Sequence, residues 1–271
     1  MTMRERFLEG RTALVTGSVQ GIGLAIGKAL ASAGARLAVH GIATRELAQT
    51  AVQMMRDTGA PDARFFDADM REPSAIIAMM DEIKAWGGPD ILVNNAGIQE
   101  TASLAEVTQQ TWDDILAVNL SGAFHTMRRA LPEMAKRGYG RVINIASVHG
   151  LVASVNKAPY VSAKFGLVGL SRVAALEYAS VGSRDEGGIT VNCICPGWTE
   201  TAIIEPQISA RAAEIGGDRD TAISSLLAEK QPSRRTSRPE EIGSLVLWLA
   251  HPTAHNITGA AIPIDGGWTA Q

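Results

Sequence analysis

Tyr160 and Lys164 are the two residues of this sequence whose types and spacing best suit acid–base chemistry. They are four positions apart on a predicted helix, so their side chains share one face and lie within reach of each other. A phenol with a pKa of about 10 is a poor base at neutral pH. A nearby positive charge favours the phenolate and lowers this pKa. We therefore expect Tyr160 to take a proton from an alcohol, with Lys164 assisting.

Two polar residues complete a candidate catalytic group with this pair. Ser147 closes a predicted strand and could hold a substrate oxygen by a hydrogen bond, and Asn119 could support a water chain that returns protons through Lys164. Each residue alone also has a structural interpretation, because serine often caps a strand end or helix and asparagine often satisfies backbone groups. The four together, in this order along the chain, favour catalysis.

A glycine-rich loop follows the first predicted strand and opens the first predicted helix. It runs from Thr16 to Gly23 (TGSVQGIG), and its glycines are Gly17, Gly21 and Gly23. Glycines permit a tight turn and let the backbone approach a pyrophosphate, whose charge then lies at the free amides of the helix. Such a loop could also be only a strand-to-helix turn. We predict that Gly17, Gly21, Ile22 and Gly23 bind a dinucleotide.

Other candidate cofactor residues follow later predicted strands, at the edge where open α/β sheets bind ligands. Asn95 and Gly97 belong to the segment NNAG, whose small residues would let a cofactor lie against the backbone. Asp69 could accept a hydrogen bond from an adenine amino group, or it could cap the next helix. Met70 could pack on the adenine ring. A positively charged nicotinamide at this edge would also lower the pKa of Tyr160.

The end of the second predicted strand leaves the choice between NAD and NADP open. Residues 40–45 read HGIATR. No acidic residue is present there for a ribose 2′-hydroxyl, and no basic residue directly follows the strand for a 2′-phosphate. We expect Arg45 to be a solvated residue in the first turn of the next helix.

Several residues near the candidate catalytic group indicate a pocket for a small carboxylate. A lysine, a histidine and two glutamines would supply a charge partner and directional donors. Lys157 and His149 could instead be a solvated loop residue and a capped strand end, and the tryptophans could belong to the core. We predict a small hydroxy or keto acid as substrate, and the predicted substrate-binding residues are Gln99, Ser147, His149, Lys157, Tyr160, Trp198, Gln207 and Trp268.

Short β-branched runs alternate with segments of helical period, which predicts a doubly wound, Rossmann-type α/β fold with a seven-stranded parallel sheet and helices on both faces. The predicted strands are 12–16, 36–40, 64–67, 90–94, 141–147, 189–195 and 260–265; the predicted helices are 22–33, 44–58, 73–86, 111–137, 159–180 and 239–250. No linker divides the chain, so we predict one domain over 1–271. The irregular segment 199–236 is expected to be a helical substrate flap.

Composition excludes several other classes of protein. The 271 residues are 46% hydrophobic and carry a net charge of −3, without the concentrated basic footprint of a nucleic-acid binder. No stretch is long and apolar enough for a membrane span. The cysteines, Cys193 and Cys195, are expected to face opposite sides of a strand and to stay reduced, which fits the cytoplasm. We assign no metal ligand.

The sequence resembles the short-chain dehydrogenase/reductase family over essentially its whole length. The resemblance rests on TGSVQGIG, the NNAG segment, Asn119, Ser147, Tyr160, Lys164 and the pair Pro196 and Gly197. It implies that Tyr160 is the acid/base, Ser147 orients substrate, Lys164 binds the nicotinamide ribose and assists Tyr160, and Asn119 anchors a proton relay. It also implies that Pro196, Gly197 and Thr201 lie beside the nicotinamide, with Thr201 contacting the carboxamide.

Further stretches, among them NIASVHGLVAS, NKAPYVSAK and CPGWTETAIIEPQI, resemble family members that oxidise a short hydroxy acid. In those members the residues matching Gln99, His149 and Lys157 hold the carboxylate, and those matching Gln207, Trp198 and Trp268 lie around it. They use NAD although a glycine occupies the position of Gly41, and they are homotetramers, so the resemblance implies NAD and a homotetramer here. The alternatives are a family member acting on a sugar, a polyol or a 3-oxoacyl substrate, and a cofactor-sensing scaffold without catalysis.

Overall fold

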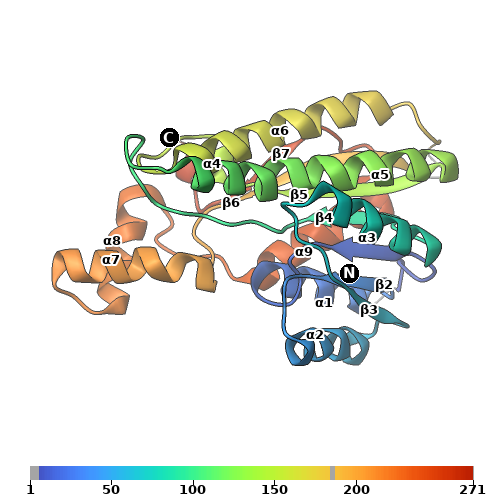
Figure 1. The fold of residues 1–271 in the computed structure, drawn as a ribbon, viewed down its shortest axis with the longest axis horizontal. Coiled ribbons are helices and arrows are strands. Elements are labelled where there is room, and N and C mark those ends of the chain that lie inside the picture. Colours follow the sequence, from blue (N-terminus) through green and yellow to red (C-terminus); the bar gives the residue numbers. More distant parts are fainter. Residues whose placement is uncertain (1–5, 184–186, 271) are drawn as a thin grey trace.

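The computed structural model describes residues 6–183 and 187–270 and has the predicted seven-stranded sheet at its centre. All strands are parallel, in the order β3-β2-β1-β4-β5-β6-β7 (Figure 1). The strands are β1 (Thr12–Val15), β2 (Arg36–His40), β3 (Ala63–Phe66), β4 (Ile91–Asn94), β5 (Tyr139–Ile145), β6 (Gly188–Pro196) and β7 (Ala261–Ile264). The predicted fold class is confirmed, and the strand boundaries shift by one or two residues.

Helices cover both faces of this sheet. The α-helices are α1 (Gly21–Ser32), α2 (Arg45–Thr58), α3 (Pro73–Ala85), α4 (Gln109–Leu116), α5 (Gly122–Arg137), α6 (Ala158–Tyr178), α7 (Glu205–Ile215), α8 (Arg219–Lys230) and α9 (Pro239–Ala250). One core cluster joins the sheet to α1, α2 and α9, and a second joins it to α3, α5 and α6. In Figure 1, α5 and α6 lie in the upper part of the view and α1 and α2 in the lower part.

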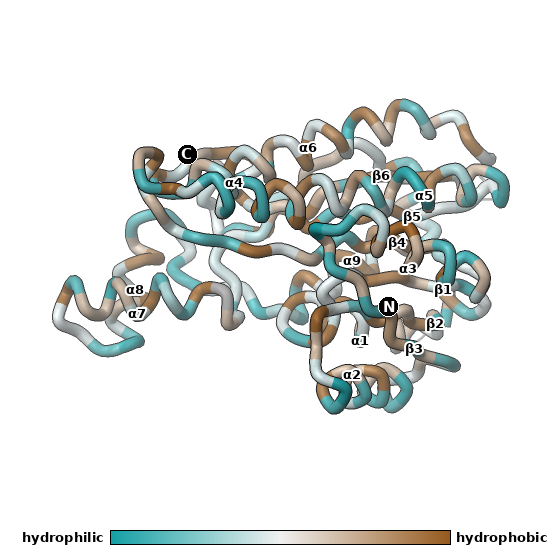
Figure 2. Tube along the Cα trace, viewed as in Figure 1, coloured by the Kyte–Doolittle hydropathy of each residue, from teal (hydrophilic) through white to brown (hydrophobic). Residues whose placement is uncertain are grey.

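The strand sequences explain this sandwich. Successive side chains of a strand point to opposite faces, so a strand covered on both sides must be apolar at consecutive positions. In β1, Ala13 and Val15 join the cluster of α1 and α9, whereas Leu14 joins the cluster of α3 and α5. By contrast, α2 is covered on one side only: it alternates between hydrophobic and hydrophilic residues in Figure 2, and its buried residues include Ala51 and Met55.

The predicted helix over 111–137 is not continuous in the structure. It consists of α4 and α5 joined by a π-helical turn, Ala117–Ser121. A π-turn adds one residue per turn and is common at functional sites, because it redirects the side chains that it carries. The turn holds Asn119, a buried member of the predicted catalytic group.

The segment 199–236 is largely helical, as expected. It contains α7 and α8, which extend from one end of the molecule in Figure 1. Its small core is formed by Ile204, Ile208 and Ala222, against which Trp198 packs.

One expectation about the cysteines is wrong. Cys193 and Cys195 are free and buried, but both belong to one cluster on the same face of β6. Residues two positions apart in a strand share a face, so the predicted opposite orientation had no geometric basis.

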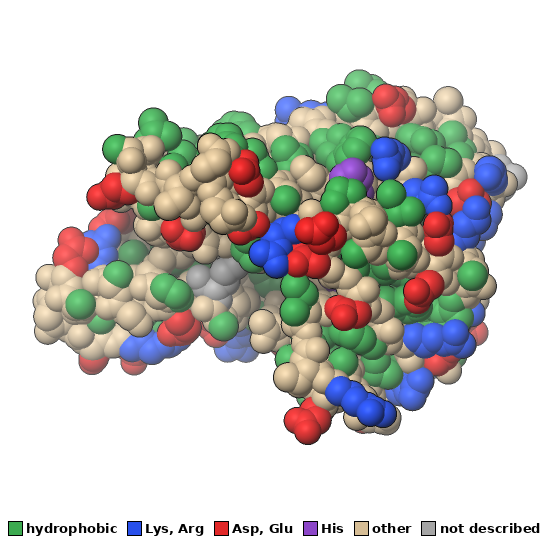
Figure 3. Space-filling view, in the orientation of Figure 1, with side chains coloured by type: hydrophobic (Ala, Val, Ile, Leu, Met, Phe, Trp, Pro, Cys, Tyr) green, Lys and Arg blue, Asp and Glu red, His purple; other side chains and the backbone are tan. Residues whose placement is uncertain are grey.

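Two further properties concern the charge of the surface and the hydrophobicity of the helices. On the face shown in Figure 3, acidic and basic side chains are interspersed. Within the described parts of the chain, no helix is long and apolar enough to cross a membrane.

Candidate active site

A cavity of about 610 Å³ lies at the carboxyl end of the sheet, between the strand ends and α7. Of the predicted site residues, all but two line this cavity: Gly17, Gly21, Ile22, Asp69, Met70, Asn95, Gly97, Gln99, Ser147, His149, Lys157, Tyr160, Lys164, Pro196, Gly197, Trp198, Thr201, Gln207 and Trp268. Gly23 and Asn119 are not part of its wall. Residues from distant parts of the chain thus meet at the edge where open α/β sheets bind ligands.

The glycine-rich loop 16–23, here termed the phosphate loop, has the backbone shape that its glycines predict. Gly17 and Gly21 have φ of +64° and +57°, which few side chains tolerate. A Cβ atom on Gly23 would lie 2.2 Å from the Gly17 carbonyl oxygen, so Gly23 supports the loop from behind. Helix α1 begins at Gly21 without a side-chain cap and without an acidic residue in its first turn. Its free amides and positive dipole end therefore fit a pyrophosphate.

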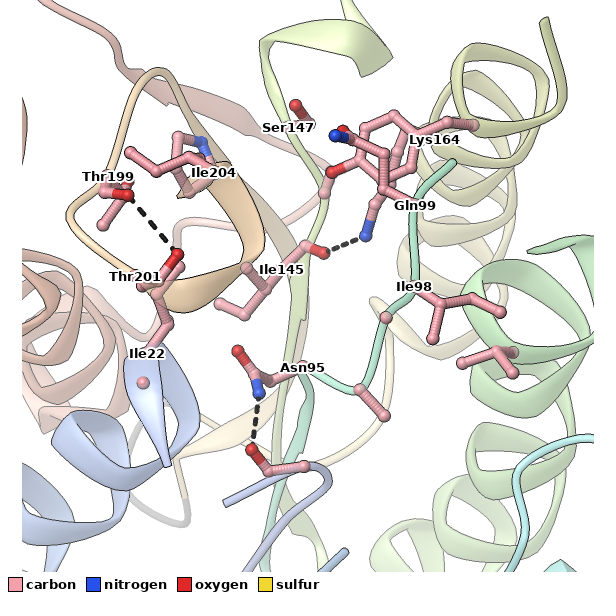
Figure 4. Close-up of a pocket in the computed structure, with 18 of the residues that line it drawn as sticks. Ile22, Asn95, Ile98, Gln99, Ile145, Ser147, Lys164, Thr199, Thr201 and Ile204 are labelled. Carbon is pink, nitrogen blue, oxygen red and sulfur yellow. Dashed lines mark hydrogen bonds between the residues drawn. The ribbon is translucent and has the colours of Figure 1, made fainter. Parts of the chain in front are cut away.

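Asn95 holds this loop with its side chain. Its Nδ2 donates to the carbonyl oxygens of Thr16 and Gly17, at 2.9 and 3.1 Å (Figure 4). In return, the Thr16 hydroxyl accepts hydrogen bonds from the backbone N–H groups of Asn95 and Ala96. Asn95 therefore shapes the wall of the cavity, and both hydrogens of its Nδ2 are used by the loop.

On the predicted adenine side, Asp69 and Met70 have structural partners. Both carboxylate oxygens of Asp69 accept hydrogen bonds from Arg71, which lowers the pKa of Asp69. Met70 is buried, and its terminal methyl group lies close to Gly122. The Met70 side chain thus packs into the core, and the residue also lines the cavity wall.

The missing acidic residue after β2 has a steric explanation. A Cβ atom on Gly41 would lie 3.1 Å from Val19 Cγ2, so a larger residue at position 41 would crowd the phosphate loop. Ile42 follows and is 72% exposed. Arg45 is exposed at the start of α2 and does not line the cavity, as expected.

The predicted catalytic residues come from three parts of the chain. Tyr160 and Lys164 lie on α6, Ser147 follows β5, and Asn119 lies on the π-turn. Lys164 Nζ donates to the Ile145 carbonyl oxygen at 2.9 Å, close to Ser147 and Gln99 in Figure 4, and lies 5.6 Å from the centre of the Tyr160 ring.

Asn119 bonds twice to one neighbouring residue. It accepts from the Ile98 N–H at 2.8 Å and donates to the Ile98 carbonyl oxygen at 2.9 Å. These two bonds fix the loop that carries Gly97 and Gln99.

Burial governs the protonation of this group, and one expectation needs correction. In the protein alone, desolvation raises the pKa of Tyr160, and a hydrogen bond with Ser147 opposes this rise. Burial also lowers the pKa of Lys164 to about 8. The expected lowering of the Tyr160 pKa by Lys164 is therefore not seen in the protein without a cofactor, because desolvation dominates and the Lys164 ammonium is directed to the Ile145 carbonyl oxygen.

Lys157 is the charged centre of the predicted carboxylate pocket. Its Nζ donates to Gln207 Oε1 of α7 at 2.8 Å and has no ion-pair partner among the described residues. Desolvation lowers its pKa to about 8. Desolvation and the charge of Lys157 lower the pKa of His149 to about 4, so His149 is neutral at pH 7. This pocket combines a partly desolvated cation with polar groups.

Trp198 lies beside this cation, and Trp268 stacks on Trp198. Their rings are stacked, with centroids 6.4 Å apart, and Lys157 Nζ lies 5.8 Å from the centre of the Trp198 ring. The Trp268 ring also meets the edge of His149 at 5.5 Å. Both tryptophans are half-buried in the cavity wall, and Trp198 also packs against the small core of the segment 199–236.

The sequence did not single out several residues of the cavity wall. They include Val19, His40, Ala68, Arg71, Ile145 and Ile204. His40, Ala68 and Arg71 lie at or just after the ends of β2 and β3, and this position at the carboxyl edge was the signal that could have found them. No local pattern identifies Ile204, because it reaches the cavity through the fold of the segment 199–236.

Comparisons with known proteins agree with this geometry. The family model described as short chain dehydrogenase matches residues 11–212. D-beta-hydroxybutyrate dehydrogenase of Cupriavidus necator is 44% identical over 265 residues, covering 97% of this chain and 100% of the relative. The protein of the same name from Rhizobium meliloti is 44% identical over 262 residues, covering 96% and 99%.

Among solved structures, a gluconate 5-dehydrogenase from Burkholderia cenocepacia J2315, in complex with NADP and tartrate, matches with a TM-score of 0.87 and 32% identity over 100% of both chains. The sequence match and the structural match extend over almost the entire chain, and the predicted resemblance is confirmed. This protein belongs to the short-chain dehydrogenase family.

Proposed function

We propose that this protein catalyses the reversible oxidation of (R)-3-hydroxybutyrate to acetoacetate with NAD. The observation that carries the proposal is Lys157, a partly desolvated cation in the same cavity wall as Tyr160, whose ammonium has a neutral glutamine as its described hydrogen-bond partner. A small carboxylate would supply the missing negative charge. The two relatives with 44% identity are both named for D-beta-hydroxybutyrate, which is the same hydroxy acid.

In this mechanism the protein residues bind the acid and move one proton. Lys157, His149 and Gln99 hold the carboxylate, with Gln207 and Trp268 around it, so that the hydroxyl of the substrate lies near Ser147 and Tyr160. Ser147 orients that hydroxyl, and Tyr160 accepts its proton as general base. Lys164 and Asn119 support the return of the proton to solvent. In the reverse direction Tyr160 donates the proton to the keto oxygen.

The cofactor fits the other half of the cavity. When bound, NAD⁺ supplies the hydride acceptor and a positive charge that favours the ionised form of Tyr160. The phosphate loop and the uncapped N-terminus of α1 would hold its pyrophosphate. Pro196, Gly197 and Thr201 would lie beside the nicotinamide. We favour NAD over NADP because His40, Gly41 and Ile42 offer no positive charge for a 2′-phosphate.

We further propose that the chain is one domain whose segment 199–236 acts as a flap over the substrate. Gln207 of α7 is joined to Lys157 of the body by a hydrogen bond, so a carboxylate that binds Lys157 also meets the flap. Closure of such a segment excludes water and completes the pocket.

For the assembly, we propose a homotetramer. Apolar side chains remain exposed on outer helices, including Phe124 on α5, Val173 and Leu176 on α6 and Trp248 on α9. Exposed apolar side chains of this kind, present on helices of both faces, are a common basis for subunit contacts. A cytoplasmic location is consistent with the two free, buried cysteines.

The test measures initial rates of NADH formation with (R)-3-hydroxybutyrate, its (S) enantiomer and the uncharged methyl ester, each with NAD and with NADP. We expect strong activity only with the (R) acid and NAD. Activity on the ester, on polyols or on 3-oxoacyl thioesters without activity on the acid would show that the carboxylate pocket is misassigned. Equal activity with NADP would contradict the cofactor preference alone.

A further inference from the structure

His40, at the end of β2, is a buried residue that the proposed chemistry does not use. It is 2% exposed and lies between the phosphate loop and the end of β3. Its Nδ1 lies 3.1 Å from the Gly17 backbone N–H, which donates to it, and its Nε2 lies 3.0 Å from the Ala68 carbonyl oxygen. Since one ring nitrogen must accept and the other must donate, the imidazole is neutral and carries its proton on Nε2. Burial also lowers the pKa of His40, in agreement with the neutral form.

The His40 imidazole is one of two side chains that bond to the backbone of Gly17. The Gly17 carbonyl oxygen accepts a hydrogen bond from Asn95 Nδ2 at the end of β4, while its N–H is held by His40 at the end of β2. The backbone of Gly17 adopts φ of +64°, so the orientation of its peptide groups depends on such partners. Gly17 and Ala68, the two residues that His40 joins, both line the cavity.

We propose that His40 is a positioning residue for the dinucleotide. Its neutral ring fixes the orientation of the Gly17 peptide and ties the phosphate loop to the wall at Ala68, so that the pyrophosphate cradle is formed before the cofactor arrives. Preorganisation of this kind improves affinity, because the loop does not have to be ordered during binding. The inference rests on the proposed dinucleotide-dependent function and adds a residue that specifies the shape of its cofactor site.

The main test compares NADH binding, followed by fluorescence titration, in the parent protein, His40→Leu and His40→Asn. We expect His40→Leu to weaken NADH binding about tenfold, which corresponds to about 1.4 kcal/mol. His40→Asn should stay within about threefold of the parent, because its Oδ1 can occupy the position of Nδ1 and accept from Gly17. The matched control His255→Leu, outside the cavity wall, should bind NADH as the parent does.

Two further readouts separate positioning from a general loss of structure. In steady-state kinetics, His40→Leu should raise KM for the dinucleotide while kcat at saturating dinucleotide and KM for the hydroxy acid stay near the parent values. In the protein without dinucleotide, NMR should show the His40 proton on Nε2 and a Gly17 amide that is protected from hydrogen exchange, with this protection lost in His40→Leu and kept in His40→Asn.

Three results would overturn the inference: NADH affinity of His40→Leu equal to that of the parent, His40→Asn as weak as His40→Leu, or a His40 proton on Nδ1. Failure of the parent itself to bind NADH would overturn the proposed function and the inference together. The parent titration distinguishes that outcome from failure of the inference alone, in which the parent binds NADH and the leucine variant binds it equally well.

Discussion

The two halves of the cavity are built in different ways. The proposed cofactor half is made largely of backbone: Gly17, Gly21 and Gly23 shape it, and Asn95 and His40 hold it by hydrogen bonds to main-chain atoms. The proposed substrate half is made of side chains, with Lys157, His149, Gln207 and the two tryptophans converging from separate loops and from α7.

This difference bears on what each half can specify. A backbone cradle suits a ligand common to a whole family, because its shape depends on glycines and strand ends and tolerates few changes. A pocket of converging side chains can change its ligand by substitution of single residues while the sheet stays intact. The cofactor half should therefore fail together with the fold, and the substrate half should fail by losing only the recognition of the acid.

Tyr160 lies between the proposed cofactor half and the proposed substrate half of the cavity, and Tyr160→Phe should have the largest effect on turnover. Removal of the phenol oxygen should lower kcat by roughly 10²- to 10⁴-fold, the usual contribution of a general acid–base group, while NADH binding measured by titration stays unchanged. Tyr178→Phe, on the same helix but packed against the core, is the matched control and should retain turnover. Near-normal kcat in Tyr160→Phe would remove Tyr160 from the mechanism.

Lys157→Ala should damage only the substrate half. Loss of the charge partner should reduce kcat/KM for the hydroxy acid by an amount equivalent to about 2 to 5 kcal/mol, with kcat/KM for the methyl ester nearly unchanged. Lys84→Ala, which removes a surface ion pair with Glu133, serves as the control and should change neither value. Equal losses for the acid and the ester would indicate a structural role for Lys157.

Gly23→Ala should damage the cofactor half through the backbone. The new methyl group would meet the Gly17 carbonyl oxygen, so the loop must shift, at a cost of roughly 1 to 3 kcal/mol in the free energy of unfolding. Chemical denaturation and NADH titration should show both lower stability and weaker binding. Gly169→Ala, where a Cβ atom meets nothing within 4 Å, should leave NADH binding intact. If NADH affinity survived in Gly23→Ala, the cradle would be more adaptable than its geometry indicates.

The mildest perturbation, a change of pH without any substitution, should give a pH dependence confined to the acid. The pKa of Lys157 in the free protein is lowered to about 8, so Lys157 is charged below that pH and loses its charge above it. The ratio of kcat/KM for the acid to kcat/KM for the ester should therefore fall above pH 8, by roughly tenfold per pH unit. Taking the ratio cancels the titration of Tyr160 and Lys164, which affects both substrates. A flat ratio between pH 7 and pH 10 would exclude Lys157 as the carboxylate partner.

Much of the site could be predicted because its signals are local. The spacing of Tyr160 and Lys164 works within one helix, and the glycines of the phosphate loop act within one turn, so both are visible in the sequence. The tertiary roles of Asp69, Met70 and Asn95 were not visible, because their partners Arg71, Gly122 and the loop carbonyls are chosen by packing and competing hydrogen bonds.

The sequence by itself determined the order of strands and helices and hence the parallel sheet, since consecutive apolar runs must be buried on both faces and crossovers are right-handed. Only the tertiary structure decided three other properties: the π-turn at Asn119, the neutral His40 between Gly17 and Ala68, and the bond from Lys157 to Gln207. The contacts of His40 and Lys157 join groups that are far apart in the sequence, and Asn119 on the π-turn bonds to Ile98 of another segment. Their protonation and hydrogen bonding follow from burial, which exists only after the sheet and its helices have assembled.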